Sequence, residues 1–456
     1  MRASIRPGAI QRPLTLGQQQ QLQYRLDWVC NRLLETAFKT LPRKIRRKYK
    51  GSACIDGTKL PLYSRGVGKN KPKCSSDPDG GFHGRQNFHG EPGDLKEATW
   101  ALEISLLVAV DDHHGTKQWL PALPLAMTTD RPGVDLAGAA RRIFGYVKEA
   151  GYPVRWLAGD LLYTDQQPEK FQNAAREIGY RPLLGYGKKH HGRQGSHPLG
   201  MTMVEGGWYC PAMPDHLVDA TVLRRTKKAD GTALRTHEQW LGDIGKRGDY
   251  EMRPKEAPDP ATGKERLGCP ASGANAKVAC PLKPRSMKTR KTRQPNGRMA
   301  DIRLRINPPA NLTDANGQPV LDVCTQDTVT VRPSADDSDF DKYRQELRYG
   351  TTQHLTTYVR LRQAQEGLHG FAKKHAAQAL DDPEKRLVRG KAAQTLFAAL
   401  LLAAASVAKI RTFLHTADTH NGGDRWVTRE PLITALRTPP GDEAPDPPPD
   451  ELAAAA

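Results

Sequence analysis

The sequence predicts an α/β fold, a mixed sheet flanked by helices and interrupted by a β-rich insertion. Three observations predict it. The chain has 456 residues, enough for two or three domains with a sizeable core. Between residues 51 and 187, short apolar strand patterns alternate with helical patterns. Residues 188–345 are rich in Gly, Pro, Thr, Lys and Arg, and helical patterns then return at 341–380 and 391–416.

The first fifty residues predict a helical and basic region. A helix is expected over 16–40, because leucine and valine recur there at helical spacing. Residues 1–14 contain prolines and are expected to be loose. The stretch FKTLPRKIRRKYK at 38–50 holds seven Lys or Arg residues. It is either a solvated charged run or a contact for phosphate groups.

The next segment predicts three strands. One is expected over 52–63 (SACIDGTKLPLY), interrupted by a turn at Asp-Gly-Thr, and is followed by a long loop over 65–97. Strands at 99–112 and 117–129 are then joined by a turn at residues 113–115.

The sequence of residues 134–187 predicts two helices that alternate with two strands. A helix over 134–150 precedes a short apolar strand at 154–160. Asp165 is expected to cap a second helix over 167–178, because Pro168 would lie in its first turn. A strand at 181–187 completes the series.

Within the insertion, the sequence predicts short strands at MTMVEGGWYC (201–210) and DVCTQDTVTV (322–331). The last segment, 438–456, is of low complexity and is expected to be disordered.

The charge of the chain indicates a polyanionic partner. Lys and Arg number 69 against 50 Asp and Glu, a net charge of +19. Nucleic acid fits such a charge best. A membrane surface is the competing partner, but no basic amphipathic helix with an aromatic face is evident.

Three further patterns predict the compartment. The apolar run TLFAALLLAAASVA at 395–408 is shorter than the roughly 20 residues of a membrane span and predicts a buried helix. The N-terminus lacks the apolar run of a signal peptide. Seven scattered cysteines, an odd number, argue against a secreted disulfide framework. We therefore expect a cytoplasmic protein.

Three acids stand out by their position. Asp56 follows an apolar strand start, Asp160 follows the apolar VRWLAG, and Glu366 stands alone in the basic stretch YVRLRQAQEGLHGFAKKH at 358–375. Each acid by itself fits a turn, a cap or an exposed helix position. As a set, carboxylates at neighbouring strand ends and one from a crossing helix can hold two Mg²⁺ ions about 4 Å apart.

The cations around Glu366 strengthen this interpretation. Arg362 precedes it by four residues and Lys373 follows it by seven. At about 100° per residue, all three project from nearly one face of a helix. The two cations would then hold phosphates that flank the metal.

Several segments resemble the bacterial insertion-sequence DDE transposases. They are CIDGTKLP around Asp56, AGDLLYTDQQPEKF around Asp160, and YGTTQHLTTYVRLRQAQEGLHGFAKKH around Glu366, with SSDPDGGFH and VCTQDTVTV as further similar segments. The likeness spans about residues 20–415. Arg362, Glu366 and Lys373 fit the spacing of the family's Tyr, Arg, Glu, Lys signature, whereas Tyr358 lies one position before the place where the signature has its tyrosine.

The resemblance implies an RNase H-like fold, which the order of the expected strands and helices also matches. It implies a basic DNA-contacting region (1–50), the first part of the catalytic core (51–187), a β-rich insertion with basic loops (188–345), a helical end of the core carrying Glu366 (346–416), and a tail (417–456).

The resemblance also implies an activity. The enzyme would cut DNA at the inverted-repeat ends of a mobile element and join those ends to target DNA. Asp56, Asp160 and Glu366 would hold two Mg²⁺ ions, for which Mn²⁺ can substitute. Arg362, Lys373 and Tyr358 would contact DNA. The implied form is a homodimer in a synaptic complex, associated with the bacterial nucleoid. No Gly-rich phosphate loop is present, so no nucleotide cofactor is expected.

Other candidate sites have ordinary alternatives. The segment 283–305 holds nine Lys or Arg residues and one Asp, which suits the DNA backbone or a solvated loop, with Lys288, Arg290, Lys291 and Arg293 as candidate contacts. Cys210, Cys269, Cys280 and Cys324 are either ordinary buried thiols or ligands of a structural Zn²⁺. Residues 111–114, Asp-Asp-His-His, suit a polar turn better than a metal cluster.

Three other functions remain open. A metal-dependent endonuclease without strand transfer would use the same acids. A non-catalytic DNA-binding protein derived from a transposase would not need them, and neither would an RNA-binding protein.

Overall fold

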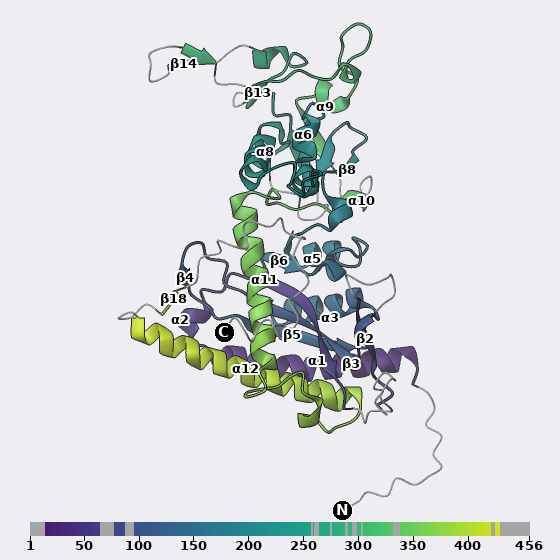
Figure 1. Ribbon diagram of the computed structural model, residues 1–456, viewed down its shortest axis with the longest axis vertical. Coiled ribbons are helices and arrows are strands. Elements are labelled where there is room, and N and C mark those ends of the chain that lie inside the picture. The colour runs from purple at the N-terminus through teal and green to yellow at the C-terminus, as the bar shows by residue number, and fades with distance from the viewer. Residues whose placement is uncertain are drawn as a thin grey trace, which may run out of the picture.

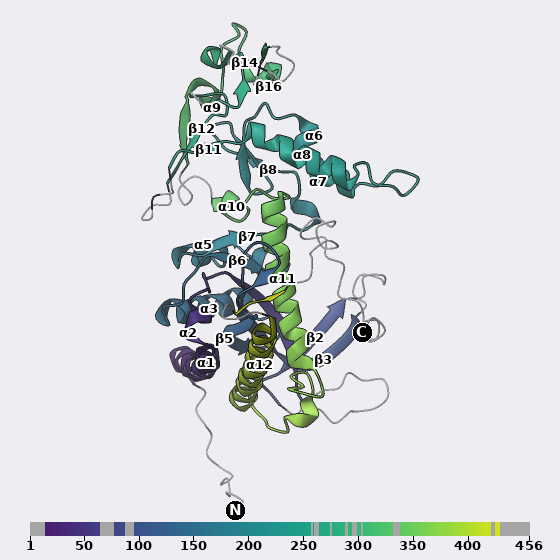
Figure 2. The same ribbon diagram turned by 90° about the vertical axis from the view of Figure 1, so that its left-hand side faces the viewer.

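A computed structural model of the chain describes residues 14–63, 77–86, 95–256, 259, 264–273, 276–287, 291–293, 299–301, 304–331, 338–420 and 425–428. Figures 1 and 2 show two parts stacked along the long axis. A sheet with helices on both faces forms one part, and residues from about 188 to 345 form the other. Helix α11 (Thr352–Lys373) runs from the second part down across the first.

The central sheet is mixed. β1 (Ala53–Pro61) pairs antiparallel with β3 (Leu95–Ala109), and β3 pairs antiparallel with β5 (Leu123–Asp130). On its other side β1 pairs parallel with β6 (Trp156–Gly159), which pairs parallel with β7 (Arg181–Leu183). The order across the sheet is therefore β5-β3-β1-β6-β7, and β2 (Gly81–Gln86) pairs with the first half of β3.

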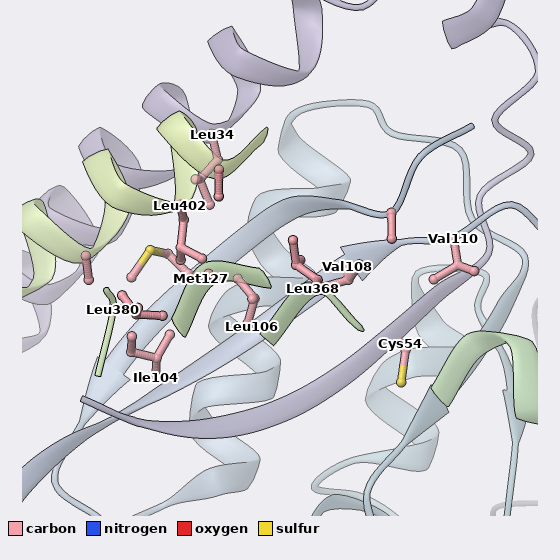
Figure 3. Packing of buried hydrophobic residues seen from close by; sticks show 14 of the residues in the cluster. Leu34, Cys54, Ile104, Leu106, Val108, Val110, Met127, Leu368, Leu380 and Leu402 are labelled. Atoms are coloured by element: carbon pink, nitrogen blue, oxygen red, sulfur yellow. The ribbon is translucent and has the colours of Figure 1, made fainter. Parts of the chain in front are cut away.

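Alternating side chains give the sheet two apolar faces. Cys54 and Leu60 of β1 contribute to the core on one face, and Ala53 and Ile55 to the core on the other. This period of two is what a strand buried on both sides requires. Figure 3 shows the first core, in which residues of β3 and β5 meet side chains from three helices, namely Leu34, Leu368 and Leu402.

Those three helices cover one face of the sheet. They are α1 (Leu16–Lys39), α11 and α12 (Lys391–His420), and α1 and α12 pack against each other. The capping box of Thr15 and Gln18 fixes the start of α1. α3 (Leu136–Glu149) and α5 (Gln172–Glu177) pack into the core on the opposite face. The short helices α2 (Arg43–Arg46) and α4 (Leu161–Thr164) and the strands β4 (Lys117–Gln118) and β18 (Val427–Thr428) complete this part.

Among the described residues, α12 is the one helix long and apolar enough to cross a membrane. Its most apolar window is 44% buried, and the helix packs against α1 and β5. A core helix of a soluble protein has the same length and composition.

The second part is built from short elements. Its strands are β8 (Arg193–Ser196), β9 (Thr202–Val204), β10 (Gly207–Tyr209), β11 (Arg253–Pro254), β12 (Glu265–Gly268), β13 (Val278–Ala279), β14 (Lys291–Arg293), β15 (Met299–Asp301), β16 (Leu304–Arg305) and β17 (Thr328–Val331). Its helices are α6 (Asp215–Val218), α7 (Ala220–Arg225), α8 (His237–Tyr250), α9 (Asp322–Thr325) and α10 (Ser338–Asp341).

The sequence predicted the main elements of the first part and few of those in the insertion. The helices expected at 16–40 and 134–150, the paired strands on either side of residues 113–115, and the two helices near the C-terminus are confirmed. The insertion is less β-rich than expected, because α8 extends over fourteen residues and DVCT forms α9 rather than a strand. The tail expected to be disordered, 438–456, lies outside the described residues.

Three local predictions were wrong. Asp56-Gly57-Thr58 is not a turn, because β1 runs through it and pairs along its whole length with β3. The expected loop over 65–97 contains β2. Asp165 does not begin a helix; it ends α4, and its carboxylate lies 2.5 Å from Lys342 Nζ.

Candidate active site

Sheet pairing brings Asp56 and Asp160 together. Ile55 of β1 is the register partner of Gly159 of β6, so the next residue on each strand is one of the two acids. The N–H of Asp160 donates to Ile55 O at 3.4 Å. Asp56 lies within β1 rather than at its end, and it shares the face of Cys54 and Leu60, which α11 covers.

Glu366 reaches the two aspartates from α11, which crosses β1 and β6. Helical spacing puts Arg362 one turn before Glu366, and the guanidinium of Arg362 lies among all three carboxylates. Its Nη1 is 3.6 Å from an Asp56 oxygen, and its Nη2 is 3.7 Å from oxygens of both Asp160 and Glu366. Three acids that the sequence singled out therefore surround the guanidinium of Arg362, although their oxygens do not all lie within 4.8 Å of one another.

The exposure of the side chains increases across the site, from Arg362 to Glu366. The side chain of Arg362 is 9% exposed and that of Asp56 16%, whereas Asp160 is 33% and Glu366 47% exposed. A substrate would therefore approach from the side of Glu366 and Asp160, with Asp56 deepest.

The ordinary explanations for the aspartates do not fit. Asp56 is a strand residue, not a turn residue. Asp160 stands at the N-cap position of α4, but its side chain makes no capping hydrogen bond. Asp56 accepts the N–H of Gly57 at one oxygen, and its other oxygen faces Arg362, as an oxygen of Asp160 does.

Burial makes the charge on Asp56 costly. Desolvation raises the pKa of Asp56 to about 7; Asp160 and Glu366 add to this effect, and Arg362 and the Gly57 N–H oppose it. The Gly57 N–H donates to Asp56 Oδ1 at 2.7 Å. The single positive charge of Arg362 thus does not neutralise the negative charges of the three carboxylates.

The donor set fits hard divalent cations. Three carboxylates offer oxygen ligands of the kind that Mg²⁺ and Mn²⁺ take. The carboxylates surround a positive group already, and an additional cation would lower the cost of ionising Asp56.

Residues of α11 and β1 that the sequence analysis did not connect with the site lie beside it. The guanidinium of Arg362 donates to the thiol of Cys54 on β1. His369 is buried, and burial, together with Lys373 and Arg362, lowers its pKa to about 3. Gln365 joins His369 to the sheet, with Nε2 3.3 Å from Leu106 O. His369 lies one helical turn after Glu366 and could have been found from that spacing.

The predicted DNA contacts have different surroundings. Lys373 is half-buried in the last turn of α11. Tyr358 is 2% exposed and stacks on His354, so its ring belongs to the core instead of a DNA-facing surface. Lys291 and Arg293 lie on β14, and Lys288 and Arg290 lie outside the described residues.

A second acidic group lies elsewhere. Asp111, Asp112 and His113 are the group of described residues whose ligand atoms all lie within 4.8 Å of one another. Their carboxylates have protein partners: Asp111 accepts the Trp119 N–H at 2.6 Å and pairs with His113, and Asp112 accepts Ser52 Oγ–H at 2.6 Å and pairs with Arg155 at 2.9 Å. These contacts anchor the connection after β3, as a polar turn would.

Comparisons of the chain with models of protein families, with curated proteins and with solved structures find no match. Function is therefore inferred from the residues of the site.

Proposed function

We propose that the chain is a DDE transposase, a metal-dependent enzyme that cleaves DNA at the ends of an insertion sequence and joins them to target DNA. The observation that carries the proposal is the meeting of Asp56, Asp160 and Glu366 around Arg362 at 3.6–3.7 Å. The sequence resemblance implies the same three acids as the catalytic set.

The sheet supports an RNase H-like core. Its order, β5-β3-β1-β6-β7, has three antiparallel strands followed by two that continue parallel to β1. The resemblance implies an RNase H-like core with one acid on the first strand and one on the fourth. The positions of Asp56 within β1 and of Asp160 directly after β6, the strand parallel to β1, support that proposal.

The chemistry would proceed by direct displacement at phosphorus. A water oxygen bonds to phosphorus as the bond to the 3′ oxygen breaks, which leaves a 3′-OH and a 5′-phosphate. That 3′-OH then attacks a second phosphodiester, in the opposite strand or in target DNA. Two Mg²⁺ ions held by the three acids would supply the charge that activates the nucleophile and stabilises the leaving oxygen.

The protein's own groups would position the DNA. Arg362 holds the acids in one place and is the cation nearest to any phosphate that reaches them. Lys373, two turns beyond Glu366 along α11, and the basic segments at 38–50 and 283–305 would bind the DNA backbone. Assembly of a homodimer on paired DNA ends follows from the same proposal.

A DNA cleavage assay tests the proposal. Wild type and Glu366→Gln would be incubated with Mg²⁺ or Mn²⁺ and a plasmid that carries the DNA natively flanking this gene. We expect cleavage at defined ends by wild type, and a loss of about 10³-fold or more in Glu366→Gln, because losing a metal ligand removes several kcal/mol of transition-state stabilisation. DNA binding should change little.

The matched control is Glu384→Gln, which alters an exposed glutamate in the turn Pro383–Lys385, outside the site. Equal cleavage by Glu366→Gln and Glu384→Gln would refute the role of Glu366. Tight DNA binding without cleavage by any of the proteins would favour the non-catalytic alternative. Cleavage without joined products would favour an endonuclease.

A further inference from the structure

Four cysteines from separate segments of the insertion converge in its interior. Cys210, Cys269 and Cys280 belong to one buried cluster, and Cys324 belongs to the adjoining one. Each is only 6–7% exposed. Every pair among the four interacts electrostatically, so the thiols share one neighbourhood although the chain distance from first to last exceeds a hundred residues.

Three of the cysteines occupy the same local structure. Cys210, Cys269 and Cys280 directly follow β10, β12 and β13, and each is followed by proline. In each case the carbonyl of the cysteine accepts an N–H from three residues on, at 3.0, 3.0 and 2.9 Å. A proline at the second position favours such a turn. The repetition gives three copies of one tight turn, each with a thiol at its start.

The turns direct backbone donors at sulfur. The N–H of Ala212 donates to the Cys210 thiol, and the N–H groups of Leu282 and Lys283 donate to the Cys280 thiol. Burial raises the pKa of both thiols, and these donors oppose that effect. Backbone N–H groups aimed at sulfur are the second-sphere contacts that orient a metal-bound cysteine.

A buried lysine supplies charge beside the cluster. Lys283 is 8% exposed, and its Nζ donates to Gln326 O at 2.8 Å and lies 3.7 Å from Asp327. It interacts with Cys280 and Cys324 and favours their ionised forms. Four thiolates around a divalent ion carry a net charge of −2, which a neighbouring cation would partly offset.

Short elements surround the cysteines. The strands that precede three of them have two to four residues, and the insertion is divided into small apolar clusters. The six cysteines in the described part of the chain are free thiols, so no disulfide among the described residues competes with a metal for these sulfurs. A metal ion bound by all four would tie these separate elements together.

We propose that Cys210, Cys269, Cys280 and Cys324 bind one structural Zn²⁺ that joins three turns and α9 into a single unit of the insertion. Four thiolates in a closed, buried site suit a tetrahedral ion without a catalytic water. The sulfurs are spread more widely than the 4.8 Å that delimits Asp111, Asp112 and His113. Binding therefore requires the thiols to turn inward, to the separation of about 3.8 Å set by Zn–S bonds of about 2.3 Å. The proposal does not depend on the proposed DNA chemistry.

Metal analysis of the full-length protein tests it. Protein purified without chelator should contain one zinc per chain, and Co²⁺ exchanged into it should show the absorption bands of tetrahedral cobalt bound by thiolates. Cys280→Ala should lose at least tenfold in zinc affinity, whereas Cys30→Ala, which alters a buried thiol of α1, should keep full zinc occupancy.

The measurement on wild type keeps the test decisive even if a cysteine variant fails to fold. A folded wild-type protein that contains no zinc, and whose thermal transition is unchanged by added Zn²⁺, would overturn the proposal. Stoichiometric iron in place of zinc, or full zinc occupancy in Cys280→Ala, would also overturn it.

Discussion

Arg247 in the insertion and Arg362 in the core are both buried arginines that meet carboxylates, but they meet them differently. Arg247 forms a close pair with Glu205 and also donates to the carbonyls of Leu217 and Val218 at 2.6 and 3.0 Å. Glu205 also accepts from His191 at 3.1 Å. Burial alone would raise the pKa of Glu205, but Arg247 and His191 hold it at about 2.

Arg362 faces three carboxylates at 3.6–3.7 Å, beyond ordinary hydrogen-bond length. The pKa of Asp56 there is raised to about 7, mainly by burial. One arginine thus completes a structural ion pair, and the other stands among more negative charge than it balances. The difference separates a group that holds the fold together from a group that awaits a further cation.

The largest expected difference comes from the same substitution at both arginines. Arg247→Met should lower the free energy of unfolding by about 3–5 kcal/mol, because it leaves the buried carboxylate of Glu205 unpaired. Arg362→Met should cost about 1 kcal/mol or less, because Asp160 and Glu366 are partly solvated and Asp56 can take up a proton. Urea denaturation of both variants measures this, and equal losses would contradict the comparison.

Neutralising the acids should have opposite effects at the two sites. At pH 8 without divalent metal, Asp56→Asn should raise the free energy of unfolding by about 1–3 kcal/mol, because it removes a charge whose burial is unfavourable. Glu205→Gln should lower that free energy, because it leaves Arg247 without its partner. Thermal unfolding of both variants at pH 8 checks the signs; a loss of stability in Asp56→Asn would show that its charge is already compensated.

The pH dependence sharpens the same comparison. The folded-state pKa of Asp56 is raised from 3.8 to about 7, so folding favours its protonated form. Its contribution to stability should therefore fall as the pH rises from about 4 to about 7. Glu205 has a lowered pKa of about 2, so its contribution is present above about 4.5 and is lost as the pH falls toward 2.

Both pH dependences are measured by the free energy of unfolding of metal-free protein, in the presence of chelator, across the pH range. Asp56→Asn should remove the decrease in this free energy between pH 4 and 7. Glu205→Gln should remove part of the decrease that occurs as the pH falls toward 2. An unchanged decline in Asp56→Asn would assign it to another group, such as Asp27, whose pKa burial raises to about 6.

A smaller effect is expected from added metal. Mg²⁺ at ten times its dissociation constant should stabilise wild type by about 1.4 kcal/mol, and Asp160→Asn much less. Asp112→Asn is the matched control, because it alters the second acidic group and leaves the proposed site intact. Each protein is compared with its own metal-free form by thermal unfolding. Stabilisation that is lost in Asp112→Asn and kept in Asp160→Asn would move the metal to the second group.

Much of the central sheet and the members of the acidic site could be predicted from sequence. The apolar strands and long helices have clear periods, and Arg362 and Glu366 are one helical turn apart in any helix. The turn predicted at Asp56 was wrong because Asp-Gly commonly marks turns, whereas pairing on both sides of β1 outweighs that local preference.

Contacts between distant segments could not be predicted in the same way. The stacking of Tyr358 on His354 is an i,i+4 contact within α11, but the burial of its ring depends on the apolar cluster against which α11 packs, and the local pattern does not give that packing. The spacing of the four cysteines follows no common metal motif; their convergence depends on how three strand ends meet in the fold. The capping role predicted for Asp165 failed because a single turn of helix ends there instead.

The most direct test of the central claim is to locate Mn²⁺ by anomalous diffraction in crystals of the protein soaked with that ion. The proposed function predicts a peak bounded by the carboxylates of Asp56, Asp160 and Glu366, with Arg362 displaced from between them. A peak only at Asp111, Asp112 and His113, with Arg362 still among the three acids, would contradict the claim that these acids form a catalytic metal site.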